Sequence, residues 1–208
     1  SWIYSYLTQR KMKRVVNLSD DLKKLEDYLR RYNLETNIFD ITSELGIPSI
    51  TCFTIDGTGI GDAVNIGAKS CTNYHDAIEG AVLESIQSRR GSRINRENSE
   101  TEKKIEGKNI WTVEERHLYC RPLERINDLK PWLETSDEVD YELLMKRDLN
   151  FKSALKNIVR RGYHVFVADI TLPEIKAKGF EVLKVIIPEL HPLYLSEDAK
   201  ALYSVHYG

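Results

Sequence analysis

The clearest pattern of apolar and polar positions lies in the middle of the chain, over residues 74–90. Apolar or small residues recur there every three to four positions, which predicts an amphipathic helix. Asn73 is placed to cap the first turn, and Asp76 and Glu79 lie near the positive end of the helix dipole. We expect the helix to pack against a neighbouring element through a face of small and aliphatic residues, namely Ala77, Ala81, Val82, Ser85 and Ile86.

Strand-like runs flank this helix on both sides. Each of two units predicts a helix followed by two strands, and these strands cover 37–42 and 47–55 in the first unit and 163–171 and 180–188 in the second. The helix of the second unit is expected over 153–161. The pattern therefore predicts an α/β fold, with α+β mixed character, in which helix–strand–strand pseudo-repeats form a mixed sheet covered by helices.

Both units carry the tripeptide Asp-Ile-Thr where their first strand ends, at 40–42 and at 169–171. The shared order and spacing favour a structural pseudo-repeat over a chance match. We expect Asp40 and Asp169 to cap Asx turns rather than to act as catalytic acids. The aliphatic residues of the second unit are expected to lie in the core: Val165, Val167, Val182, Val185 and Ile187.

Composition and charge narrow the functional classes. The chain has 208 residues, of which 30% are charged and 41% hydrophobic, an ordinary balance for a soluble globular protein. A net charge of −2 argues against a surface that coats nucleic acid. No apolar run is long enough to span a membrane. Three widely spaced cysteines, Cys52, Cys71 and Cys120, fit a reducing cytoplasm and give no metal-binding spacing.

The central helix also carries the candidate chemistry. Glu84 and Gln87 are three positions apart and therefore share a face. Carboxylate and amide oxygens can hold Mg²⁺, and guanidinium groups can bind phosphoryl oxygens, so one interpretation is a site for a metal-bound phosphate. The alternative is an ordinary solvated helix, because acids early and arginines late are what the helix dipole favours. The arginines in question are Arg89, Arg90, Arg93 and Arg96.

The run 81–89 resembles the Ala-Leu-x-Glu-Ala-x-Gln-Ser-Arg signature of the YcaO family. Members of that family are ATP-dependent enzymes that activate backbone amides of peptides and give azolines or thioamides. The similarity extends over nearly all of the chain, through the Gly46-Ile47-Pro48 turn, the region of His75, Gly162 ahead of the second strand pair, and the closing Val185-Ile186-Ile187-Pro188. It implies that residues 1–208 are the C-terminal portion of a YcaO-like domain, without the two upstream glutamate motifs of the nucleotide site.

The resemblance also implies ligand roles for individual residues. Glu84 and Gln87 would correspond to ligands of Mg²⁺–ATP, and Arg89 to a residue that positions phosphate or ligand. Arg96 is the nearest match to the arginine of a Gly-x-Arg-Glu-Asp segment, at a shorter spacing than in the family. No catalytic residue is assigned.

The implied activity is phosphorylation of a backbone amide oxygen in a ribosomal peptide or protein, by the full-length parent rather than by this chain alone. The implied partners are that substrate and a leader-peptide-binding or sulfur-delivery protein, and a homodimer stays open. Two other interpretations also stay open. One is a non-catalytic nucleotide-binding or scaffold module that docks a partner protein. The other is a regulatory α/β domain unrelated to ATP, which solvent exposure of Glu84 and Gln87 would favour.

Overall fold

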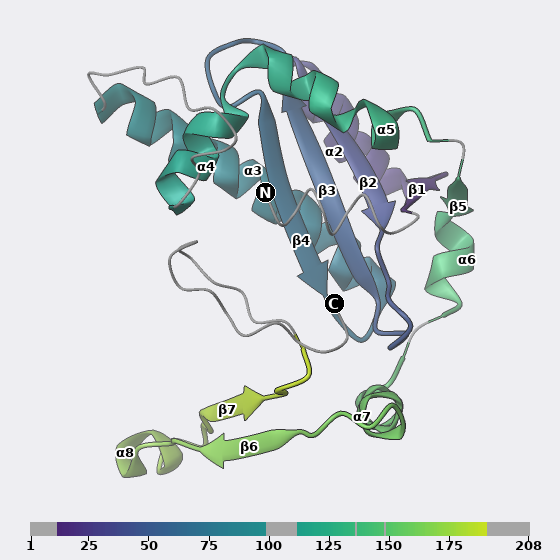
Figure 1. Ribbon diagram of the computed structural model, residues 1–208, viewed down its shortest axis with the longest axis vertical. Coiled ribbons are helices and arrows are strands. Elements are labelled where there is room, and N and C mark those ends of the chain that lie inside the picture. Colours follow the sequence, from purple (N-terminus) through teal and green to yellow (C-terminus); the bar gives the residue numbers. More distant parts are fainter. Residues whose placement is uncertain (1–11, 99–111, 136, 148, 191–208) are drawn as a thin grey trace.

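The computed structural model describes residues 12–98, 112–135, 137–147 and 149–190 (Figure 1). The elements follow one another in this order: β1 (Lys13–Val16), α2 (Asp20–Arg30), β2 (Leu34–Asp40), β3 (Ser49–Asp56), β4 (Val64–Ser70), α3 (Tyr74–Asn98), α4 (Val113–Cys120), the 3-10 helix η1 (Leu123–Leu129), α5 (Lys130–Leu133), β5 (Glu138–Asp140), α6 (Tyr141–Met145), α7 (Phe151–Arg160), β6 (Phe166–Asp169), α8 (Pro173–Lys176) and β7 (Leu183–Ile186). No helix within these ranges is long and apolar enough to cross a membrane.

Five strands form the main sheet, in the order β4-β3-β2-β1-β5. Neighbouring strands are antiparallel except for β1 and β5, which are parallel. β6 and β7 form a separate antiparallel pair. The predicted mixed α/β fold is confirmed, but the two units contribute to two sheets rather than to one.

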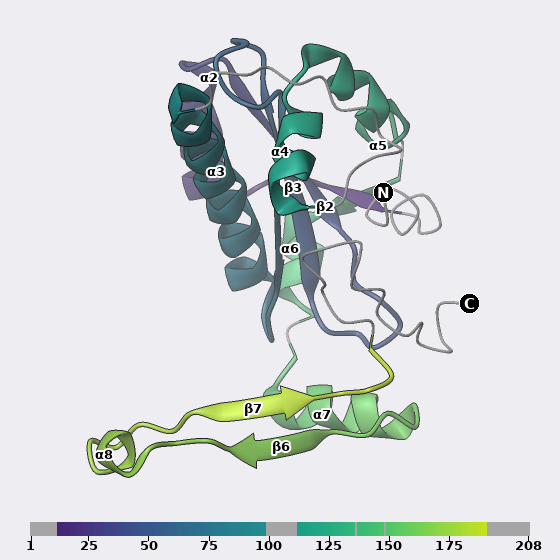
Figure 2. The ribbon, with the colours of Figure 1, turned by 60° about the vertical axis from the view of Figure 1, so that its left-hand side comes forward.

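Helices cover both faces of the five-stranded sheet (Figure 2). On one face, α2, α3 and α6 enclose a core that contains Ile38, Ile50 and Cys52 of β2 and β3. On the other face, Phe39 and Phe53 pack against η1 and α5. This burial removes the apolar surface of both strands from water, which is the main source of the sheet's stability.

The central helix α3 lies against β3 and the edge strand β4, and the small face predicted for it is confirmed. Ala77 and Ala81 are completely buried, and the Asn73 side chain caps the helix by accepting the backbone N–H of Asp76 at 2.8 Å. The close approach depends on Gly67 of β4, where an added Cβ would lie 2.1 Å from the carbonyl oxygen of Ala81. Any side chain at this position would push the helix off the sheet.

The Asp-Ile-Thr corner of the first unit connects β2 to the loop before β3. Asp40 Oδ1 accepts the backbone N–H of Thr42 at 2.9 Å, which is an Asx turn. The Thr42 hydroxyl oxygen accepts the N–H of Ser49 at 3.1 Å, and the N–H of Ile41 donates to the Ser49 carbonyl at 2.9 Å. These three bonds join the end of one strand to the start of the next.

The corner of the second unit repeats this arrangement. Asp169 Oδ1 accepts the N–H of Thr171 at 2.9 Å, the Thr171 hydroxyl oxygen accepts the N–H of Val182 at 2.8 Å, and the N–H of Ile170 donates to the Val182 carbonyl at 3.0 Å. Both aspartates are thus turn caps, as predicted. The repeated corner confirms that the two units share a local structure.

The burial predicted for the second unit is wrong. Val167 and Val185 are 59% and 55% exposed, Val182 is exposed as well, and only Val165 and Ile187 are half-buried. Figures 1 and 2 show the β6–β7 pair set apart from the five-stranded sheet. The two strands are present, but neither α2 nor α3 packs on them, so within the described part of the chain their apolar faces have no cover like that of the first unit.

Candidate functional site

Glu84 lies on α3 beside the outer edge of β4. Its side chain is exposed, and its Oε2 accepts the backbone N–H of Ala68 at 2.8 Å. β4 is the end strand of the five-stranded sheet, so this N–H has no strand neighbour on that side within the described sheet. The carboxylate is therefore held in one orientation at the junction of helix and sheet edge.

Gln87 follows Glu84 by three positions, so both lie on the same side of α3, as the spacing predicted. Its side chain is also exposed. The buried residues of this part of the helix, Val82 and Ser85, face the sheet instead. Glu84 and Gln87 therefore offer their oxygens to the surroundings of the β4 edge rather than to the interior of this chain.

Arg89 lies on another side of the helix. It follows Glu84 by five positions, which places the two side chains about 140° apart around the helix axis. Its Nε donates to Oδ2 of Asp56 at 2.8 Å, and Asp56 is completely buried at the end of β3. The other oxygen of Asp56 accepts the N–H of Thr58 at 2.9 Å. The structure thus pairs Arg89 with the β3–β4 loop and does not bring it together with Glu84 and Gln87.

A second buried carboxylate, which was not among the residues predicted from sequence, lies at the other end of the same loop. Asp62 is 1% exposed and lies 3.3 Å from Nδ1 of His117 and 3.5 Å from Nε of Arg121. His117 belongs to α4, and Arg121 is the first residue after the end of that helix. Asp56 pairs with Arg89 of α3, and Asp62 pairs with residues of α4 and its end, so the two aspartates fix the β3–β4 loop to both helices. The one signal in the sequence was an aspartate at each end of a glycine-rich loop, which sequence alone does not connect to distant cations.

Arg96 belongs to the last turns of α3, but its side chain lies outside the described part of the chain. The same holds for Arg90 and Arg93. Their proposed contacts with phosphate remain predictions.

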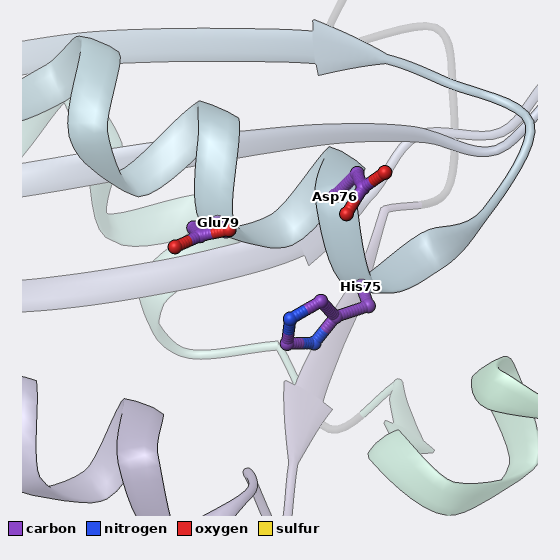
Figure 3. Close-up of side chains that lie close together, drawn as sticks. All are labelled: His75, Asp76 and Glu79. Carbon is purple, nitrogen blue, oxygen red and sulfur yellow. The ribbon is translucent and has the colours of Figure 1, made fainter.

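The first turn of α3 carries a further group of potential ligands, shown in Figure 3. One ligand atom from each of His75, Asp76 and Glu79 lies within 4.8 Å of the others, and all three side chains are exposed. His75 Nδ1 is 3.1 Å from the Tyr141 hydroxyl. The Asp76 carboxylate accepts a hydrogen bond from the Asn73 amide at 2.8 Å. Acids at this end of a helix are already favoured by its dipole.

The cysteines do not supply a nucleophile in the interior. Burial raises the pKa of the Cys52 thiol to about 11 and that of the Cys120 thiol to about 12. Both thiols are therefore protonated at neutral pH, and the thiolate is the reactive form. Cys52 is a small buried side chain of the core, and the half-buried Cys120 packs against the core cluster on the other face of the sheet.

Comparison with solved structures finds the same fold in larger proteins. A heterocyclase in complex with substrate and cofactor aligns with a TM-score of 0.63 at 18% identity, over 88% of this chain and 24% of its own. YcaO from Methanopyrus kandleri bound with AMPPCP and Mg²⁺ aligns with a TM-score of 0.59 at 17% identity, over 90% of this chain and 47% of its own. The E. coli microcin synthetase McbBCD complex with pro-MccB17 aligns with a TM-score of 0.54 at 16% identity, over 85% of this chain and 45% of its own. The chain therefore spans less than half the length of each.

No curated protein matches the sequence. A family model does: the YcaO cyclodehydratase model, described as ATP- and Mg²⁺-binding, matches residues 1–191. This match covers the signature run on α3, both Asp-Ile-Thr corners and the β6–β7 pair. The chain belongs to the YcaO family.

Proposed function

We propose that this chain is part of an ATP-dependent YcaO enzyme that activates backbone amides of a ribosomal peptide or protein, giving an azoline or a thioamide. Membership of a family described as ATP- and Mg²⁺-binding cyclodehydratases supports it. The observation that carries the proposal is the position of Glu84 and Gln87, exposed side by side on a helix that is packed tightly onto the sheet edge.

The donor atoms of these two residues fit a magnesium nucleotide. Mg²⁺ prefers hard oxygen ligands, and it is bound in proteins by one or two carboxylates together with phosphates and water. The N–H of Ala68 orients the Glu84 carboxylate, and the Gln87 amide can add a neutral oxygen. When bound, Mg²⁺–ATP would supply the phosphoryl group that turns an amide oxygen into a leaving group. Phosphoryl transfer from ATP needs several carboxylates around Mg²⁺, and Glu84 supplies one of them, so we expect no turnover by this chain alone.

Arg89 and Arg96 are the two arginines for which the family resemblance implies a role at the cofactor site. Since the Arg89 guanidinium is already paired with the buried Asp56, its proposed role is to fix the β3–β4 loop against α3. Arg96 remains the candidate for a direct contact with phosphate.

The proposed partners are a peptide or protein substrate and a protein that binds its leader or delivers sulfur. Two of the similar structures support this by what they contain. One is a heterocyclase in complex with substrate, and the other is a synthetase complex with pro-MccB17 bound.

A second candidate function is a non-catalytic nucleotide-binding or scaffold module that docks a partner protein. The solvent exposure of Glu84 and Gln87 favours the scaffold form of this candidate, because exposed polar side chains on a helix need no ligand to explain them. Solvent exposure of Glu84 and Gln87 is also what a regulatory α/β domain unrelated to ATP predicts. Membership of the YcaO family favours the nucleotide-binding interpretations over that one.

The test is phosphate release by the full-length protein with its peptide substrate. Glu84→Gln removes one negative charge from the proposed metal site at nearly constant volume. Turnover should fall on the order of a hundredfold or more, because electrostatic stabilisation of a transferring phosphate contributes that much. Glu142→Gln, which neutralises an exposed acid on α6 outside both groups of potential ligands, is the matched control and should leave turnover unchanged. Wild-type turnover in a folded Glu84→Gln protein, checked by a thermal melt, would refute the assignment.

A further inference from the structure

The β6–β7 pair, residues 166–186, is an exposed apolar feature that the proposed function leaves unexplained. All residues of both strands are exposed, including Phe166 at 57%, Leu183 at 51% and Ile186 at 49%. An isolated two-stranded hairpin is marginally stable in water and needs further strands or a packed helix. Phe166 and Ile186 lie on one face of the pair, and Leu183 lies on the other. Exposed apolar surface on a paired strand is a candidate interaction site.

The shared corner allows the two hairpins to be compared residue by residue. Val167 lies two positions before the aspartate of its corner and pairs with Val185. Ile38 lies two positions before the aspartate of the first corner and pairs with Cys52. The pair Val167–Val185 therefore takes the place of Ile38–Cys52, which is buried in the core under α3.

The neighbouring residue pair on the same face of each hairpin shows the same correspondence. Leu183 pairs with Asp169, just as Ile50 pairs with Asp40. Ile50 is completely buried, whereas Leu183 is 51% exposed. One face of the β6–β7 pair thus carries the same apolar positions as the face of β2–β3 that α3 covers.

In the first unit, the apolar face of β2–β3 is covered by a strand and the helix that follows it in the chain. β4 adds to the edge of β3 by antiparallel pairing, and α3 then returns over the face of both strands. Within the described residues, β6 and β7 pair only with each other, so each has an outer edge without a strand. Adding a strand to such an edge satisfies its backbone groups and lets side chains dock in alternation.

We propose that the β6–β7 pair is the docking surface for a strand-and-helix segment of the β4–α3 type, from the part of a YcaO domain that residues 1–208 do not contain. The helix of this segment covers Val167, Leu183 and Val185, and its strand extends the sheet. The similar structures supply the length for such a segment, since this chain covers 24% and 47% of two of them. The proposal rests on the repeat and on family membership, not on ATP chemistry.

The occupant can be identified by photo-crosslinking in the protein at its natural length, in its own cells. Val185→p-benzoylphenylalanine places a reactive group on the surface to be covered, and the attached peptide is sequenced by mass spectrometry. We expect a peptide of YcaO sequence from outside residues 1–208, in the same polypeptide or in a separate one. A peptide from within residues 1–208 would indicate self-contact or a second copy, and would overturn the proposal. A non-YcaO protein or no crosslink would also overturn it.

A charged substitution in the same surface tests whether docking depends on its apolar side chains. Val185→Asp should abolish the crosslink made by a benzophenone at Val167, while the thermal melt of the five-stranded unit stays unchanged. Leu143→Asp on α6, also an exposed apolar residue at 50%, is the matched control and should leave the crosslink intact. An intact crosslink in Val185→Asp would contradict the proposal. Because ATP is not needed, failure here is distinct from failure of the Glu84 assay.

Discussion

In the β2–β3 hairpin the pair Ile38–Cys52 is buried under α3, whereas in the β6–β7 hairpin the matching pair Val167–Val185 is exposed. The corners of the two hairpins nevertheless form the same three hydrogen bonds. Those bonds join residues close in sequence, so a tripeptide and its turn suffice to form them. Burial depends on an element that arrives later in the chain. The comparison separates what local sequence determines from what long-range packing determines.

The largest expected difference is in the cost of removing matched aliphatic side chains. Ile50→Ala should lower the free energy of unfolding by about 2–5 kcal/mol, because it leaves a cavity in a fully buried site. Leu183→Ala, at the equivalent but exposed position, should change it by about 0.5 kcal/mol or less. Urea denaturation of the two variants measures this, and equal losses would contradict the assignment of burial.

A smaller difference is expected at the corner threonines. Thr42→Val leaves the N–H of Ser49 without its acceptor and removes the contact with the Tyr74 hydroxyl at 3.0 Å. It should cost about 1–2 kcal/mol. Thr171→Val removes the matching acceptor at an exposed site, where water can replace it, so the same denaturation assay should detect almost no change. A larger loss for Thr171→Val would reverse the comparison.

The smallest effect concerns protonation in the second corner. Hydrogen bonds from the hydroxyl and backbone N–H of Thr171, with the ammonium of Lys176, lower the pKa of Asp169 from 3.8 to about 2. A depressed pKa means that the carboxylate's contribution to the corner is present above pH 3.8 and is lost as pH falls through about 2. An NMR titration of Asp169 should show this midpoint, and Thr171→Val should raise it. A midpoint near the ordinary value in the unsubstituted chain would contradict the Asx geometry.

Much of the first unit could be predicted from sequence. The three-to-four spacing located α3, and Asn73 and the small residues identified its cap and its buried face. The Asp-Ile-Thr repeat located both corners. The core assigned to Val167 and Val185 was wrong, because alternation in a strand indicates an apolar face and does not say which element covers it.

The candidate site was also predictable only in part from the sequence. The shared face of Glu84 and Gln87 follows from helix geometry, and that geometry also places Arg89 elsewhere. The partner of Arg89 could not be found from sequence, because Asp56 lies 33 positions away across a strand and a loop. Long-range pairs of this kind depend on the packing of α3 onto the sheet.

Hydrogen exchange of this chain tests most directly the claim that, among the described residues, only the first hairpin is covered by a strand and a helix. Amides of β3 (Ser49–Asp56) should exchange only on global unfolding, since this strand is central and covered on both faces. Amides of β7 (Leu183–Ile186) should exchange orders of magnitude faster, by local opening of the uncovered pair. Equal protection of the two strands in this chain alone would contradict the account.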